Sequence, residues 1–358
     1  MNQIENLIIS EKFDEARKQC LMRLTENRQD PIAWHYLGMC HYFTQRFDES
    51  IDAYQNAIRL QPAFAWMSCF NLSQAFLITG DLEKGFALFE SRLIDPRRLS
   101  KPVPKWLGEE ISGKTLLVHQ DEGLGDAIQF LRYIPYLQNY HCRVLLYLNK
   151  DLHGLFQHLN VPLLTDRIYE CDLHVETGSL PFCFKTTLSN ILPPVKIVCS
   201  RQPEIGRIGI VWQSSKSIGP EISAPKSLNL EQWQPLLTLP GFQYVCVQKD
   251  VSPEDAAFLE RHGVERPPIA SFTDTVKILE RCERVICVDT CVAHLSASMG
   301  SPTWILLPFN ACWRWLANRT DSPWYPSVKL FRQCRNKIWD EPIQEIKQEL
   351  IHCRTSSN

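Results

Sequence analysis

The sequence has no apolar run long enough to cross a membrane and no large excess of charge of either sign. A membrane-spanning helix needs about 20 predominantly apolar residues, and no stretch of the 358 residues comes near that length. The net charge of -2 gives no electrostatic reason to expect nucleic acid or an anionic membrane as partner. The first residues, MNQIENLIISEKFDEARK, lack the basic and apolar regions of a secretory signal. These absences favour a globular protein with no membrane span and no nucleic-acid partner.

The chain also lacks any Cys-x-x-Cys pair, although it contains 14 cysteines. They are scattered from Cys20 to Cys353, and the closest group, Cys282, Cys287 and Cys291, surrounds a short apolar segment. Without the spacing of metal ligands, we interpret them as free thiols that pack as small hydrophobic side chains. So many unpaired thiols indicate a reducing compartment. We therefore expect a cytoplasmic protein with no metal ligands among these residues.

Residues 1–98 repeat at a spacing of about 34 residues. Trp34, Leu37, Gly38 and Tyr54 stand at the spacing of a tetratricopeptide repeat, with small residues where paired helices approach and large ones between them. About two and a half to three such units are present, close to the minimum for a stable array. Two interpretations stay open: a surface for a peptide or protein partner, and a cap that only packs on the next domain.

The rest of the chain divides into a linker and two α/β series. Residues 99–112 break the helical pattern with prolines. Short apolar segments then alternate with helical ones over 113–200 and again over 201–358, where the chain ends in a helix. This alternation indicates parallel sheets flanked by helices, and two series predict two Rossmann-like halves with a cleft between them. Residues 171–182 are expected to be a short extended piece that ends in a turn.

Polar residues suited to a diphosphate follow the strands of the second half. Asp289 and Thr290 come directly after an apolar strand, and Thr290 is the expected cap of a helix that contains His294. The free N–H groups and positive dipole end of that helix fit a phosphate, and Lys226 and Lys249 at neighbouring strand ends add positive charge. Each residue alone has a structural alternative, a cap, a core histidine or a surface lysine. Their convergence on one sheet edge favours a nucleotide-phosphate site.

A second candidate site is the loop after the first strand of the α/β part. Gly123-x-Gly125-Asp126 resembles a dinucleotide fingerprint but lacks its third glycine. A nucleotide-binding loop, a catalytic loop and a tight turn with Asp126 as helix cap are all open on this pattern alone. Trp212 and Gln248, at the ends of two strands of the second half, are further candidates.

Two motifs give the chain a resemblance to a known family. Gly-Leu-Gly-Asp-x6-Tyr-x-Pro at 123–135 and Val-Asp-Thr-x3-His-Leu-x4-Gly-x-Pro at 288–302 resemble ADP-heptose:lipopolysaccharide heptosyltransferases, glycosyltransferase family nine. With its repeats, the chain looks like bacterial proteins that join tetratricopeptide repeats to a glycosyltransferase domain of that type. The resemblance covers nearly the whole sequence.

The resemblance implies a GT-B fold, with the acceptor on the first α/β half and the donor on the second. It implies inverting transfer from a nucleotide-diphosphate sugar, with no metal and no other cofactor. Asp126 occupies the place of the catalytic base, so the glycine loop is interpreted as catalytic and acceptor-facing. Lys226 and the helix at Thr290 would stabilise the leaving diphosphate, and His294 would contact the phosphates or the ribose.

The sequence departs from the family in three places. Cys291 stands where many relatives have Gly or Ala, the loop 213–227 lacks the usual glycine and basic residues, and the half 113–200 is short. The leading hypothesis is a glycosyltransferase whose repeats recruit a protein or glycan acceptor. The alternative is a non-catalytic scaffold with a degenerate transferase domain. A sugar-nucleotide epimerase has the same two-domain shape but no residue support here.

Overall fold

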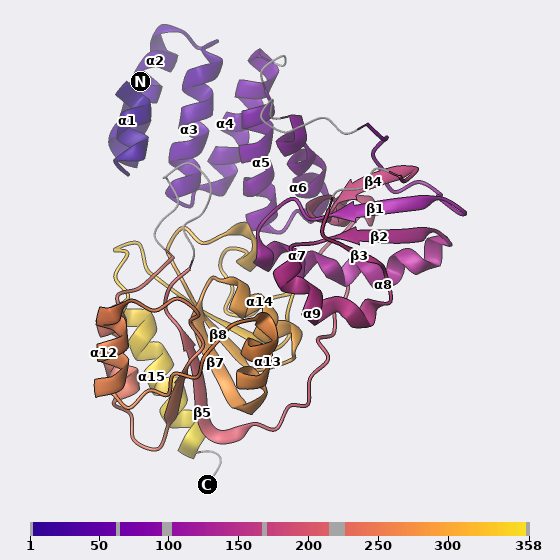
Figure 1. The fold of residues 1–358 in the computed structure, drawn as a ribbon. Helices are drawn as coiled ribbons and strands as arrows, with labels where there is room; N and C mark the ends of the chain where they lie inside the picture. Colours follow the sequence, from indigo (N-terminus) through magenta and orange to yellow (C-terminus); the bar gives the residue numbers. More distant parts are fainter. Residues whose placement is uncertain (1–2, 62–64, 95–101, 167–169, 215–225, 356–358) are drawn as a thin grey trace.

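The computed structural model describes residues 3–61, 65–94, 102–166, 170–214 and 226–355 (Figure 1). The start of the predicted linker 99–112 and most of the loop 213–227 lie outside these residues. Within them, helical repeats come first and two parallel sheets with helices follow. The predicted order of a helical part and a parallel-sheet α/β part is therefore confirmed.

Paired helices form the N-terminal part, drawn in indigo and violet in Figure 1. They are α1 (Gln3–Ile9), α2 (Phe13–Glu26), α3 (Pro31–Phe43), α4 (Phe47–Leu60), α5 (Trp66–Thr79) and α6 (Leu82–Phe89). Gly38 lies directly against the ring of Tyr54. A Cβ at this position would stand only 2.7 Å from the ring, so a larger residue would clash. The Ser50 hydroxyl donates a hydrogen bond to the Gly38 carbonyl across the same pair, at 2.8 Å. Small residues thus let α3 and α4 approach, as the repeat pattern predicts.

Local sequence signals set the ends of these helices. The Asp30 side chain accepts hydrogen bonds from the backbone N–H groups of Ile32 and Ala33, and Pro31 occupies the first helical position of α3, as is usual at helix starts. Gly80 ends α5 with φ at +93°, a left-handed conformation that glycine adopts without strain.

The first α/β half contains a four-stranded parallel sheet in the order β3-β2-β1-β4. Its strands are β1 (Thr115–His119), β2 (Arg143–Tyr147), β3 (Leu163–Leu164) and β4 (Leu173–Glu176), with helices α7 (Leu124–Phe130), α8 (Ile134–Leu137), α9 (His153–Phe156) and α10 (Leu180–Cys183). The segment expected to be a short extended piece is β4, a full member of this sheet. Strand order reverses between β1 and β4, and such switch points hold ligands in open α/β sheets.

The second half contains a five-stranded parallel sheet in the order β6-β5-β7-β8-β9. Its strands are β5 (Glu204–Val211), β6 (Gln243–Cys246), β7 (Cys282–Val288), β8 (Thr303–Leu307) and β9 (Val328–Arg332), with helices α11 (Gln234–Leu237), α12 (Pro253–Arg261), α13 (Phe272–Arg281), α14 (Cys291–Ser298) and α15 (Asp340–Thr355). The switch point of this sheet lies between β5 and β7.

Short 3-10 helices join these elements. They are η2 (Glu90–Ile94), η3 (Leu131–Tyr133), η4 (Gln138–Tyr140), η5 (Lys150–Leu152), η6 (Gln157–Leu159), η7 (Thr177–Ser179), η8 (Leu230–Trp233) and η9 (Trp313–Trp315). Two of them matter for the site below: η2 ends the helical part, and η9 follows the fourth strand of the second sheet.

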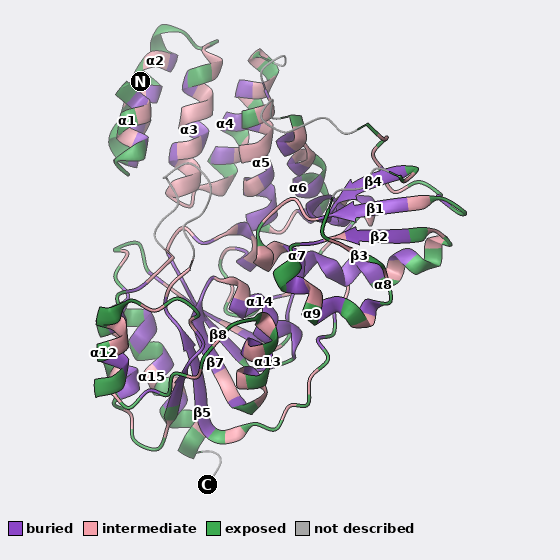
Figure 2. Cartoon of the chain, in the orientation of Figure 1, coloured by how far each residue is buried: buried purple, intermediate pink, exposed green. Residues whose placement is uncertain are grey.

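Most strand residues of both sheets are buried (Figure 2), except in the short strand β3. One hydrophobic core joins all three parts of the chain. Successive residues of a strand point to opposite faces: Val211 of β5 belongs to this shared core, whereas Ile210 belongs to a second core beneath α15. On the repeat side, the ring of Phe86 lies 5.5 Å from Trp313 and 6.3 Å from Trp324. The repeats are therefore packed into the α/β part. In the described residues, none of the helices is long and apolar enough to cross a membrane.

We expect Phe86→Ala to lower the free energy of unfolding by about 3–5 kcal/mol, the usual cost of truncating a buried phenylalanine. Because the repeats share a core with the α/β part, the loss should appear in one transition, followed in urea by circular dichroism and by tryptophan fluorescence. Met22→Ala, an exposed position of α2, is the control and should change little. Separate transitions for the two probes would contradict the shared core.

Candidate active site

Helices α7 and α14 meet where the two halves join. Each follows the carboxyl end of a central strand, β1 and β7 respectively. Gly125 lies in this contact: a Cβ there would stand 2.8 Å from His294 Cδ2 and 3.4 Å from the Cα of Cys291. The second glycine of the loop is therefore required for close approach of the two helices. Through this contact the switch-point edges of both sheets come together.

Asp126, one residue further along α7, forms an ion pair with Arg314 of η9. The two side chains are 18% and 14% exposed. Arg314 also lies over the ring of Trp313, at 4.5 Å from its centre, and donates to Cys312 Sγ at 2.8 Å. Gly123 takes an extended conformation at the start of α7. The proposed base is thus held by a cation from the other half of the molecule.

The environment of Asp126 favours proton acceptance nearer neutral pH than an ordinary aspartate allows. Burial raises the pKa of its carboxyl, and the guanidinium of Arg314 only partly offsets this effect. The nearby carboxylates of Asp121 and Asp289 raise the same pKa further. A raised pKa beside a fixed cation is typical of functional carboxylates.

Lys226 and Asp289 meet at the switch point of the second sheet. Lys226 lies in the connection after β5 and Asp289 directly follows β7, and their Nζ and Oδ2 atoms are 2.6 Å apart. Burial disfavours both charged forms, but the attraction within the pair outweighs it. The pKa of Lys226 is raised and that of Asp289 is lowered, so both groups are charged at neutral pH. A fixed ammonium therefore stands at the position where this fold class binds ligands.

His294 is a buried neutral imidazole. Burial lowers its pKa to about 3, so it carries no positive charge near neutral pH. Its Nδ1 lies 3.0 Å from the Tyr325 hydroxyl, and its ring stacks on Trp315 at 5.1 Å. Thr290 is the N-cap of α14 in an extended conformation, without a capping hydrogen bond from its side chain. The N-terminus of α14 thus lies beside Asp289 without a side-chain cap.

The other predicted residues are placed less centrally. The Gln248 side chain accepts a hydrogen bond from the Gln213 backbone N–H at 3.1 Å, and so fixes the start of the loop after β5. Lys249 is exposed, and none of its contacts with the described residues joins it to the Lys226 group. Trp212 is fully buried in the second core and donates to Asp255 Oδ2 at 3.3 Å. The structure therefore gives Trp212 a packing role.

The loop after β1 is also fixed from the repeat side. Asp121 forms an ion pair with Arg92 of η2, with 2.8 Å between Oδ2 and Nη2. Its other oxygen accepts from the Gly178 backbone N–H at 3.0 Å and from the Thr177 hydroxyl at 3.2 Å. The last residues of the repeats thus position the loop that leads to Asp126.

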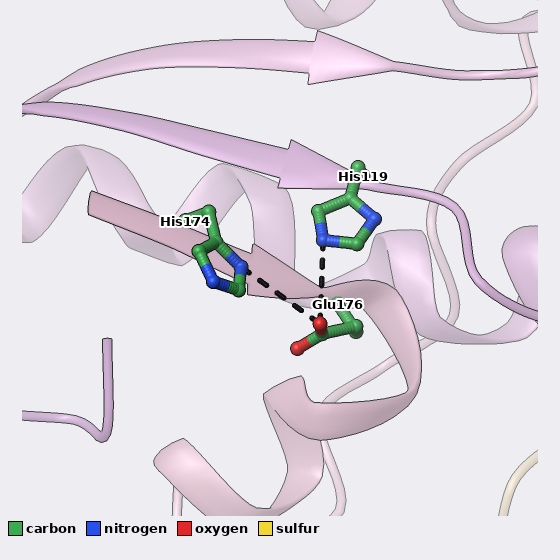
Figure 3. Close-up of side chains that lie close together, drawn as sticks. All are labelled: His119, His174 and Glu176. Carbon is green, nitrogen blue, oxygen red and sulfur yellow. Dashed lines mark ion pairs between the residues drawn. The ribbon is translucent and has the colours of Figure 1, made fainter. Parts of the chain in front are cut away.

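Sequence reasoning missed two groups of residues. Arg314 stands between two tryptophans, and a lone arginine inside an aromatic pair is the signal that could have marked it. His119, His174 and Glu176 lie close together at the switch point of the first sheet (Figure 3). They come from two strands that are far apart in sequence, so no local spacing marks them.

The sequence is similar to one repeat family and to one bacterial protein. Residues 31–64 match the family model of the tetratricopeptide repeat, which confirms that prediction. Protein FlbA of Caulobacter vibrioides is 22% identical over 333 residues, covering 79% of this chain and 55% of FlbA. The chain thus spans about half the length of this relative.

Similar solved structures include two enzymes of Escherichia coli. Heptosyltransferase WaaC, solved with ADP-2-deoxy-2-fluoro heptose, matches with a TM-score of 0.46 and 11% identity, over 66% of this chain and 99% of WaaC. The iron-containing dodecameric glycosyltransferase TibC matches with a TM-score of 0.43 and 14% identity, over 55% of this chain and 59% of TibC. Residues 31–64 are thus a tetratricopeptide repeat, and heptosyltransferases and members of glycosyltransferase family nine are among the structural neighbours of the chain.

Proposed function

We propose that the chain is an inverting glycosyltransferase that moves a sugar from a nucleotide-diphosphate sugar to an acceptor hydroxyl, without a metal in the transfer step. One observation carries this proposal: the contact of α7 with α14 places a carboxyl of raised pKa near a fixed ammonium and a helix N-terminus. A base on one side and an anion-binding group on the other are what an inverting displacement requires.

The donor diphosphate is proposed to bind at the switch point of the second sheet. Lys226 supplies a positive charge there, and Asp289 fixes its position. The backbone N–H groups at the start of α14, after Thr290, point to the same place and favour an anion. Lys249, exposed at the end of the neighbouring strand β6, is the second lysine proposed for the donor. Since His294 is neutral, it contributes hydrogen bonding and packing but no charge.

In the proposed reaction, the acceptor oxygen attacks the anomeric carbon from the side of Asp126. Its proton passes to the Asp126 carboxylate as the new glycosidic bond forms. The bond from the anomeric carbon to the diphosphate oxygen breaks, and the nucleoside diphosphate leaves with its electron pair. Lys226 and the N-terminus of α14 stabilise the negative charge that develops on it. Attack opposite the leaving group inverts the anomeric configuration.

Arg314 is proposed as a positioning residue for the base. Its guanidinium holds the Asp126 carboxylate at the contact of the halves and lowers the pKa that burial raises. Both effects keep Asp126 ionised and oriented before an acceptor binds.

The acceptor is proposed to be a protein that the repeats recruit. Ile32 of α3 and Met67 of α5 are both the second residue of their helix and are 50% and 51% exposed. Large apolar side chains at equivalent positions of successive repeats suit a peptide ligand. The repeats also contact the segment that carries Arg314, because the Ala317 N–H donates to the Ile78 carbonyl at 2.8 Å. A bound protein would be held near the proposed base.

We expect one nucleoside diphosphate of a panel to raise the melting temperature of the chain by a few degrees. At about 100 times its dissociation constant, a ligand adds roughly 2.7 kcal/mol of stability. Lys226→Ala should abolish the shift, and Lys249→Ala should reduce it. Lys277→Ala, an exposed lysine of α13, should leave it unchanged.

Lys226→Ala leaves the buried Asp289 without its cation and is expected to melt at a lower temperature on its own. The nucleotide-dependent shift, and not the melting temperature itself, is therefore compared between variants. Lys226→Arg keeps the charge and should keep part of the shift. If no nucleotide stabilises the wild-type chain, the glycosyltransferase hypothesis fails, and the non-catalytic scaffold is the remaining hypothesis.

Asp126→Asn should slow release of nucleoside diphosphate from the matching nucleotide sugar by about 10²–10⁴-fold, the range for loss of a general base. The nucleotide-dependent melting shift should persist, because Asp126 lies outside the proposed donor site. In the wild type, the rate should fall as the pH drops through the pKa of Asp126. Since burial raises that pKa, the fall begins above the usual range of an aspartate, near 3.9.

Arg314→Gln is the companion variant for this measurement. It removes the cation that lowers the pKa of Asp126, so the acid side of the pH profile should move to higher pH. If Asp126→Asn releases nucleoside diphosphate at the wild-type rate, or if Arg314→Gln leaves the acid side of the pH profile unmoved, Asp126 is not the base.

The protein acceptor can be tested with a labelled nucleotide sugar and a lysate of the cells that produce the chain. We expect the label in protease-sensitive material. The double variant Ile32→Asp, Met67→Asp should lose this labelling and still release nucleoside diphosphate to water at the wild-type rate. Label recovered only in lipid or free glycan would rule out a protein acceptor.

A further inference from the structure

Two histidines and a glutamate meet at the switch point of the first sheet (Figure 3). His119 is the last residue of β1, and Glu176 is its partner in the register with β4. His174 precedes Glu176 by two residues on β4, so both side chains point to the same face of the sheet. The parallel pairing of β1 with β4 thus brings three metal-binding side chains to one place.

The distances within this group suit a small tetrahedral cation. His119 Nε2 lies 3.4 Å and His174 Nδ1 3.8 Å from the same oxygen, Oε1 of Glu176. All three ligand atoms lie within 4.8 Å of one another. Ligand atoms bound to zinc at about 2.0–2.2 Å stand roughly 3.3–3.6 Å apart in a tetrahedron. Small side-chain rotations would bring the three atoms to that spacing.

Burial strengthens the case for a bound ion. The His119 side chain points into the group and is only 4% exposed. Neither of its ring nitrogens forms a hydrogen bond with the part of the chain that the structure describes. A buried imidazole without hydrogen bonds costs free energy of folding, and a bond from one of its nitrogens to a metal ion would offset that cost.

The carboxylate is oriented so that one oxygen faces the imidazoles. Glu176 Oε1 lies between the two histidines, and Oε2 lies 3.1 Å from the ammonium of Lys105. Lys105 is itself ion-paired with Glu90 of η2. Glu176 is therefore arranged for monodentate binding through Oε1, with Lys105 acting on its second oxygen as outer-shell partners of metal ligands do.

We propose that His119, His174 and Glu176 bind a zinc ion that fastens β1 to β4. Two imidazoles and one carboxylate are a ligand set for zinc, with water as the fourth ligand, whereas magnesium and calcium take oxygen ligands. The ion would stand where the chain enters the loop 120–126. It contacts none of the residues proposed for the donor or for proton transfer, so it is independent of the proposed reaction. The expectation of a chain without metal rested on cysteine spacing and on the family resemblance, and neither considers these strands.

The test begins with the full chain, dialysed against a chelator, loaded with zinc chloride and desalted. Elemental analysis should give about one zinc ion per chain. His119→Ala and His174→Ala should each lose this ion, whereas His141→Asn, an exposed histidine elsewhere in the same half, should keep it. Lys105→Met should weaken zinc binding by about 10- to 100-fold, as loss of an outer-shell partner does.

Free thiols can also bind zinc, so the ligand type must be measured directly. X-ray absorption at the zinc edge of the wild-type chain should show nitrogen and oxygen ligands and no sulfur. This measurement does not depend on whether the variants fold. A wild-type chain that retains no zinc, a sulfur ligand set, or full zinc retention in a folded His119→Ala variant would overturn the proposal.

Discussion

The approach of α7 to α14 through Gly125 is the constraint on which the candidate site depends. Any side chain at this position would meet the His294 ring and the backbone of Cys291. Because the helices touch there, Asp126 reaches Arg314, and the switch-point edges of both sheets share one polar region. The glycine loop therefore brings the two halves together. His294 forms the α14 side of this contact. Its imidazole is neutral and stacks on Trp315.

Ion pairs between buried and partly buried side chains then fix the charged groups around this contact. Asp121 pairs with Arg92 of the repeats, Lys226 with Asp289, and Asp126 with Arg314. Each pair joins segments that are far apart in the sequence. Such pairs add little net stability, because desolvation offsets most of the attraction. Their consequence is orientation, since each side chain is held in one place before a ligand binds, which is what electrostatic catalysis requires. The repeats take part in this arrangement through η2 and through the core they share with the α/β part.

Local sequence signals predicted the elements and part of the site. Gly38 revealed a close helix crossing, and the motifs around Asp126 and Asp289 marked residues that lie near the contact of the halves. The signals failed where a residue's role depends on long-range packing. Trp212 directly follows strand β5, where ligand-binding residues are expected. Its side chain nevertheless points into the core beneath α15, because side chains alternate between the two faces of the sheet. Arg314 finds its carboxylate only through the packing of η9 on the other half, which no periodicity in the sequence encodes.

The loop that leads to Asp126 shows why topology matters more than motif for this chain. The loop leaves β1 at a switch point, where the neighbouring strand β4 runs alongside but comes much later in the sequence. Asp121 is anchored to the backbone of Gly178 just past β4, and Gly125 is anchored on α14. Asp126 therefore follows a segment that is held at both ends. The position of the proposed base is decided by the pairing of β1 with β4 and by the contact of the two halves, and its orientation precedes any substrate.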